Sequence, residues 1–208
     1  MIKRAYNKVF IGFIFVFFHF KLNGFDLLPD FVGYLLAAGG LAALSVYAPV
    51  FSRARLAAFA LACVEGFGLV CTLLHVWEDT GSWFDWAFTL ASAAGALTLF
   101  LFMGKGMAEM LEQAQRATDA KNTAYVFGGK LAYTLLNAAL FFPPLRAVMQ
   151  LAPVSVGMIA LGVLVNLLVL LLLYRGAAVL QKAADIRAAQ ERMPTEPFSQ
   201  NETGGQEL

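Results

Sequence analysis

Six long apolar segments constrain this sequence more than any other feature. They cover approximately residues 6–22, 30–50, 56–77, 83–103, 124–142 and 153–174. Each is close to the ~20 residues that an α-helix needs to cross the hydrocarbon core of a bilayer. Backbone polar groups inside that core must be bonded within the segment, which favours helices. We therefore predict an all-α fold, a polytopic membrane bundle of about six transmembrane helices.

Composition supports a membrane setting and excludes several classes of protein. Hydrophobic residues make up 60% of the chain and charged residues only 14%, whereas soluble domains carry about a quarter charged residues. The net charge of +1 provides no field that would attract nucleic acid. The chain has no P-loop, dinucleotide-binding, zinc-protease or serine-hydrolase motif. We expect the lipid bilayer as a partner, no nucleic acid and no cofactor.

The distribution of basic residues predicts the orientation. Of the 15 Lys and Arg residues, only Lys21 and Arg146 fall on the side opposite the N-terminus, and Lys130 falls inside a segment. Because basic residues are retained on the cytoplasmic side, we expect both termini to be cytoplasmic. The remaining basic residues are Lys3, Arg4, Lys8, Arg53, Arg55, Lys105, Arg116, Lys121, Arg175, Lys182, Arg187 and Arg192.

The polar stretches predict the domain organisation. Residues 106–122 and 176–193 keep apolar residues at helical spacing. The first of these stretches is either an extension of the fourth helix or a helix on the inner surface, and the second extends the sixth helix. Residues 194–208 are rich in Pro, Gly and Glu, which predicts a disordered cytoplasmic tail. We expect one domain over residues 1–193.

Glu65 is the most unusual residue for its position, because it lies near the middle of the third apolar segment. A charge at that depth costs about 2.5–3.5 kcal/mol on insertion scales. We predict a ligand or ion site at Glu65, with Lys130, Asn137 and Asn166 as polar neighbours. The alternative is a structural contact between Glu65 and Lys130 or an Asn that fixes the order of the helices.

A second group of polar residues falls on the predicted outer side. It comprises His19, His75, Glu78 and Asp79, and a continued helix would place His75 on the same face as the last two. Imidazole and carboxylate groups are suitable ligands for a divalent metal. A solvated acidic rim is the alternative to a metal site or to acid–base chemistry at this position.

The segment between the first two apolar stretches carries signals for the start of a helix. Asp26 and Asp30 can cap the following helix, Pro29 suits its first turn, and Gly33 permits close approach of a neighbouring helix. Around residues 23–40 the D-x-L-P-D-F-x-G-Y string resembles a group of uncharacterised small bacterial membrane proteins. The resemblance implies a bacterial cytoplasmic-membrane protein and no particular chemistry.

Three function classes remain open from the sequence. The first is transport of a small solute or ion, as a permease or as the membrane subunit of a transporter, at a site near Glu65. The second is a non-catalytic assembly or regulatory subunit that binds a protein partner, or another copy of itself, through faces such as Ala58-Ala62-Gly66 and Ala87-Ala91-Gly95. The third is a membrane-embedded enzyme or metal site on the outer face.

Overall fold

The computed structural model describes residues 2–18, 21–22, 25–26, 30–74, 82–140 and 151–192. Within these residues the protein has six helices and one two-stranded antiparallel hairpin, in which Lys21 pairs with Asp26 and Leu22 with Phe25. The elements are α1 (Ile2–Phe17), β1 (Lys21–Leu22), β2 (Phe25–Asp26), α2 (Asp30–Leu44), α3 (Val50–Leu73), α5 (Ser82–Gln113), α6 (Ala117–Leu140) and α8 (Ala152–Arg192).

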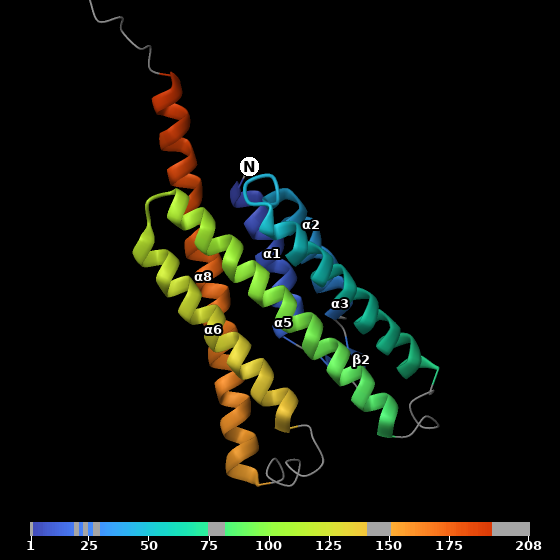
Figure 1. Ribbon diagram of the computed structural model, residues 1–208. Coiled ribbons are helices and arrows are strands. Elements are labelled where there is room, and N and C mark those ends of the chain that lie inside the picture. The colour runs from blue at the N-terminus through green and yellow to red at the C-terminus, as the bar shows by residue number, and fades with distance from the viewer. Residues whose placement is uncertain are drawn as a thin grey trace, which may run out of the picture.

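The helices form a closed ring in chain order. Each packs against its neighbour in the sequence, and α8 closes the ring against α1. Figure 1 shows them running along a common long axis, with α8 extending past the others. The backbone N–H of Lys3 donates to Gln181 Oε1 at 3.2 Å. The beginning of α1 and the last third of α8 therefore lie at the same end of the bundle.

Among the described residues, three helices are long and apolar enough to cross a membrane. They cover Val50–Leu73, Trp86–Gln113 and Ala152–Ala183, and α2 is a shorter apolar helix. The 16 residues of α1 and the 15 of α2 correspond to lengths of only about 24 and 22 Å at 1.5 Å per residue. The structure thus gives three candidate membrane spans, in α3, α5 and α8, of the six predicted from the sequence.

The outward surfaces of these helices are apolar. Leu56 on α3 is 70% exposed and Ile159 on α8 is 67% exposed, and several further Leu, Val and Phe side chains also face outward. Soluble monomers rarely expose apolar surface on this scale, and lipid chains would cover it in a bilayer. The same helices bury a second apolar face inside the ring, so they are apolar all round.

Aromatic side chains fill the inside of the ring. Phe13 of α1 stacks on Phe100 of α5, with ring centroids 5.5 Å apart. Phe17 and Phe127 pack on Phe100 from α1 and α6, at 6.3 and 6.4 Å. This cluster joins three helices that are not all neighbours in the ring. It therefore fixes the distance across the bundle.

The contact between α1 and α2 is made by glycines. A Cβ atom on Gly12 would lie 2.5 Å from the carbonyl oxygen of Gly33, and one on Gly33 would lie 2.6 Å from that of Gly12. At Gly40, a Cβ would meet the backbone of Ala5 at 2.7 Å. The two backbones approach so closely that larger residues do not fit. The predicted role of Gly33 in close helix approach is confirmed.

Several predicted boundaries were wrong. The first helix was expected over 6–22, but α1 ends at Phe17 and Lys21 begins a strand. The second was expected to reach residue 50, but α2 ends at Leu44, and Pro49 opens α3, a position that suits its fixed φ. The stretch 106–122 is divided: α5 continues to Gln113, and α6 begins at Ala117. The predicted tail, 194–208, lies outside the described residues.

Candidate functional site

Lys130 lies in the middle of the helix ring. It is on α6 and only 7% exposed. Its Nζ donates a hydrogen bond to Oδ1 of Asn166 on α8, at 2.6 Å. A short contact of this kind is typical of a charged donor. The two residues therefore form a polar link between neighbouring helices.

Three aromatic rings surround the same ammonium group. Its Nζ lies 4.9 Å from the ring centroids of both Phe17 and Phe100, and 5.6 Å from that of Tyr133. The negative faces of aromatic rings attract cations, more strongly when water is excluded. Four helices therefore contribute to holding one positive charge, since Phe17 comes from α1 and Phe100 from α5.

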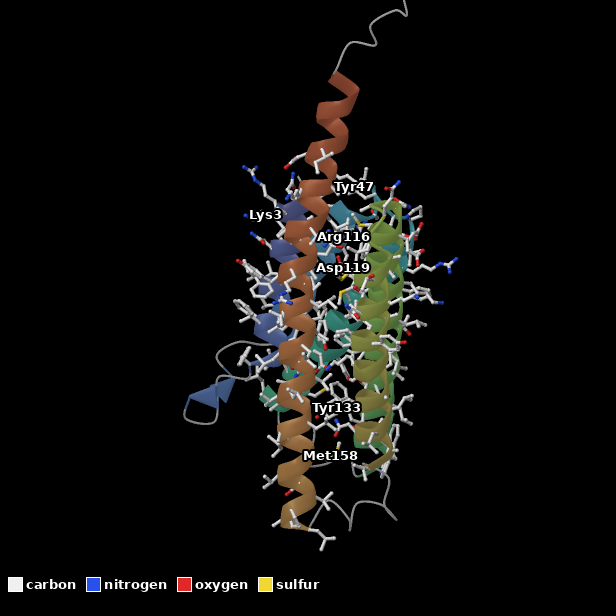
Figure 2. All side chains as sticks on the ribbon, turned by 90° about the vertical axis from the view of Figure 1, so that its left-hand side faces the viewer. Lys3, Tyr47, Arg116, Asp119, Tyr133 and Met158 are labelled. Carbon is white, nitrogen blue, oxygen red and sulfur yellow. The ribbon has the colours of Figure 1, made fainter. Side chains whose placement is uncertain are left out.

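Tyr133 is itself held in position by α8. Its hydroxyl donates to the carbonyl oxygen of Met158 at 3.4 Å, and Gly162 lies directly against that hydroxyl, where a Cβ would overlap it. Figure 2 shows Tyr133 and Met158 facing each other across α6 and α8. Gly162 thus creates the space for the phenol ring, which fixes the Tyr133 side of the Lys130 environment.

No carboxylate neutralises this cation within the described residues. The ion pair found there, between Arg116 and Asp119, lies near the other end of α6 (Figure 2). A buried charge normally has an oppositely charged partner or is strongly disfavoured. Lys130 is instead stabilised by an amide oxygen and aromatic rings. The described residues thus supply no negative counter-charge at this position, which makes it a candidate for binding an anion.

Glu65 lies in a different part of the bundle. It is half-buried on α3, and Ser92 Oγ of α5 donates to its Oε1 at 3.0 Å. The helix α5 lies between α3 and α6, which do not contact each other. The structure therefore does not form the Glu65–Lys130 contact that the sequence suggested. Glu65 and Ser92 instead make a polar contact between α3 and α5.

The other predicted site residues are distributed as follows. The structure brings Asn166 to Lys130, but Asn137 is exposed near the end of α6. Asp30 is the first residue of α2, where a carboxylate favours the positive helix end. Asp26 lies in β2 instead of the helix start. Pro29 lies outside the described residues.

The predicted metal site falls on residues that the structure does not describe. His19, His75, Glu78 and Asp79 all lie outside the described ranges. Within those ranges, no group of three His, Cys, Asp or Glu side chains could hold a metal ion. The outer metal site and the enzyme hypothesis that depends on it therefore stay predictions.

Sequence reasoning missed the aromatic part of the Lys130 site and the partner of Glu65. Phe17, Phe100 and Tyr133 are three among many aromatic residues, and Ser92 resembles any other hydroxyl in a membrane helix. The spacing along one helix contains no information about contacts across a ring. The signal that could be used was Lys130 itself, the sole basic residue inside the five apolar segments that follow the first.

Comparisons with known proteins give no family or function for this chain. The chain matches no known family model, no curated protein and no solved structure.

Proposed function

We propose that this is a multi-pass protein of a bacterial cytoplasmic membrane, with six spans and both termini on the cytoplasmic side. Three apolar helices support the membrane placement. The closed ring supports six spans, because α1, α2 and α6 are part of the same layer of helices. The contact of Lys3 with Gln181 places the first residues of α1 and the distal part of α8 at one end, where basic residues are concentrated.

The function that the geometry supports best is transport of a small anionic solute, as a permease or as the membrane subunit of a transporter. The observation that carries this proposal is the buried ammonium of Lys130, which Asn166 and three aromatic rings hold without a carboxylate among the described residues. A solute that carries a carboxylate or phosphate would supply the missing negative charge. In this role Lys130 is the binding group, and Asn166 orients it.

Lys130 is a better centre for such a site than Glu65. It contacts residues from α1, α5, α6 and α8, so a solute there would touch most of the ring. The hydrogen bond between Ser92 and Glu65 joins two adjacent helices. Glu65 is therefore assigned to the packing of α3 on α5, and we place the solute at Lys130.

The test is uptake of labelled acetate, inorganic phosphate and chloride into proteoliposomes. Wild-type protein should take up at least one of these anions, Lys130→Met should abolish that uptake, and Lys121→Met should retain it. Lys121 is an exposed lysine on the same helix, so it controls for loss of charge on α6. Absence of uptake by the wild type, or full uptake by Lys130→Met, would refute the proposal.

A second candidate, a membrane assembly subunit, is favoured by the outer face of α6. Ala124, Gly128 and Ala132 recur at intervals of four and are all exposed, and a Cβ on Gly128 would meet nothing within 4 Å. Such a face suits close contact with another transmembrane helix. Of the two faces chosen from the sequence, the first fits less well, because Ala58 and Ala62 are buried inside the bundle. In the second face, Ala87 and Ala91 are exposed on α5. Gly128→Leu should abolish self-association or a stable complex if this candidate is correct.

A further inference from the structure

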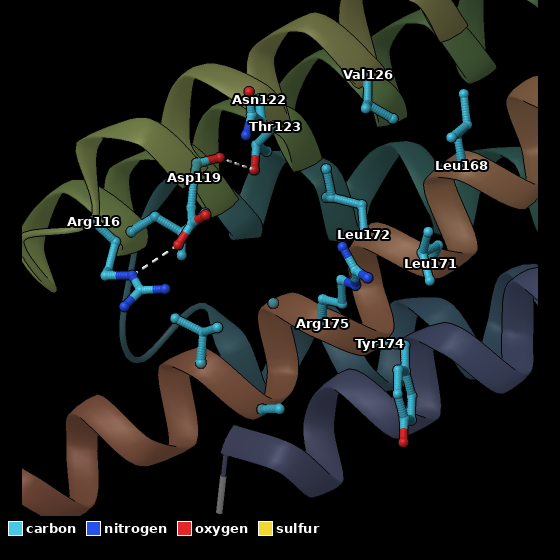
Figure 3. Close-up of a pocket in the computed structure, with 14 residues that line it drawn as sticks. Arg116, Asp119, Asn122, Thr123, Val126, Leu168, Leu171, Leu172, Tyr174 and Arg175 are labelled. Carbon is cyan, nitrogen blue, oxygen red and sulfur yellow. Dashed lines mark hydrogen bonds and ion pairs between the residues drawn. The ribbon is translucent and has the colours of Figure 1, made fainter.

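A cavity of about 520 Å³ opens between α6 and α8, near the end where α1 begins. Figure 3 shows its lining from both helices. One end is polar, with Arg116, Asp119, Asn122, Thr123 and Arg175, and the other is apolar, with Val126, Leu168, Leu171 and Leu172. The volume is in the usual range for sites that take one ligand, ~300–1,000 Å³.

The sharp turn between α5 and α6 positions the polar end. Gln115 has a φ of 59°, the left-handed conformation that commonly ends a helix. The backbone N–H of Arg116 donates to the carbonyl oxygen of Leu111 at 2.8 Å, which closes α5. The chain then enters α6 at Ala117. Arg116 is consequently held beside the first turn of α6, whose N–H groups also carry partial positive charge.

Two guanidinium groups give the polar end an excess of positive charge. Arg116 Nε donates to Asp119 Oδ2 at 2.8 Å, so one of the two is partly neutralised and fixed in place. Arg175 makes no hydrogen bond or ion pair with any described residue, and Figure 3 shows it extending from α8 toward α6. With Asp119 counted, the lining carries one net positive charge from its titratable side chains. That end is therefore suited to an anionic group.

The apolar end is open to the bilayer side of α8. Leu168 and Leu171 line the cavity and are 41% and 47% exposed. Tyr174 is 66% exposed one turn further, in the position typical of an interfacial aromatic residue. A hydrocarbon chain can lie against these residues without leaving the lipid. A free inorganic anion would use the polar end alone.

We propose that the groove between α6 and α8 binds an anionic phospholipid. The phosphate would contact Arg175 and the outer nitrogens of Arg116, and an acyl chain would lie along Val126, Leu168 and Leu171. Basic pockets between transmembrane helices on the cytoplasmic side bind such headgroups. The proposal rests on the membrane placement of α8 and is independent of anion transport at Lys130, which lies one helical turn beyond Val126.

The experiment is native mass spectrometry of purified protein titrated with phosphatidylglycerol or phosphatidylcholine of the same acyl chains. Wild-type protein should retain phosphatidylglycerol preferentially. Each of Arg116→Gln and Arg175→Gln should weaken that retention about five-fold, from ~1 kcal/mol per basic residue. Arg55→Gln is the matched control, because Arg55 is an exposed arginine on α3 outside the cavity lining.

A second variant tests the apolar end. Ala178→Trp fills the groove without changing its charge, since Ala178 is an exposed residue of the lining, and it should also reduce retention. Equal retention of both lipids, or no effect of either arginine variant, would overturn the proposal. Displacement of the lipid by millimolar inorganic phosphate, with phosphate bound at the same arginines, would assign the site to a free anion and overturn the lipid assignment. Loss of anion uptake in Lys130→Met with lipid retention unchanged would separate this site from the transport site.

Discussion

The α1/α2 contact and the α6/α8 contact use opposite means to join two helices. Between α1 and α2 the backbones almost touch, with Gly12 against Gly33 and Gly40 against Ala5. Between α6 and α8 the contact includes a hydrogen bond from Lys130 to Asn166 and a cavity lined by Arg175. Both contacts occur within one ring.

The difference shows where this bundle has space for chemistry. Lipid provides no hydrophobic driving force between helices, so close packing of small residues is the main source of a stable contact. The α1/α2 pair uses that source fully and leaves no room for a ligand. In the α6/α8 pair, a buried cation and a groove take the place of part of the close packing. We infer that α1, α2 and α3 form the scaffold and that α6 and α8 carry the function.

The largest effect is expected from a side chain inserted into the α1/α2 contact. Gly40→Leu should lower the free energy of unfolding by about 3 kcal/mol, because the backbone of Ala5 cannot move away without separating the helices. The matched control is Gly39→Leu, one residue away, where a Cβ meets nothing within 4 Å. Unfolding in a detergent–denaturant titration measures both. Equal stability of the two variants would contradict the tight contact.

A smaller loss is expected from removing the amide that accepts from Lys130. Asn166→Leu leaves a buried ammonium without its hydrogen bond and should cost about 1–3 kcal/mol. Lys130→Met removes the charge and should be neutral or stabilising. The double variant should therefore recover most of the stability lost in Asn166→Leu. If the effects of the two single variants on stability simply add, Lys130 and Asn166 do not form an interacting pair.

Gly162→Ala tests how tightly α8 positions the tyrosine. The added methyl overlaps the Tyr133 hydroxyl, but a ring can shift more easily than a backbone, so a loss of about 1 kcal/mol is expected. The hydrogen bond to Met158 would also be weakened. Gly157→Ala, on the same helix and with no neighbour within 4 Å, should have no effect. If Gly162→Ala leaves the free energy of unfolding unchanged, α8 does not confine the ring of Tyr133.

The smallest effect is expected at the exposed ion pair of α6. Arg116 and Asp119 are 55% and 38% exposed, so Asp119→Asn should change stability by less than about 1 kcal/mol. Thermal unfolding at low and high salt would measure it. A large loss that salt does not reduce would mean that this end of α6 is more buried than the structure shows.

The sequence was sufficient to predict the helices because each is encoded locally. Apolar runs of ~20 residues located all six helices, although their ends shifted where a strand at Lys21 or a proline at 49 intervened. Gly33 was also predictable as a close-contact residue. The equivalent role of Gly12 could not be predicted, because its partner lies on another helix. Nothing in the sequence distinguishes Gly12 from the other glycines among the 18 in the chain.

The candidate site was predicted only in part, for a related reason. Lys130 and Asn166 could be identified as unusual polar residues in apolar segments, and the structure brings them together. The suggested contact between Glu65 and Lys130 is not formed, because α5 separates α3 from α6. The site predicted at Glu65 itself stays a prediction. Depth along a helix can be estimated from the sequence, whereas rotation and order around a ring depend on tertiary packing.

The most direct test of the central claim is equilibrium binding of labelled acetate, phosphate and chloride to purified protein, compared between Lys130→Met and Lys121→Met. We predict saturable binding of at least one anion to the wild type and to Lys121→Met, with at least a ten-fold loss in Lys130→Met at unchanged thermal stability. Equal binding by the two variants would show that the cation inside the ring is structural and that the solute site lies elsewhere.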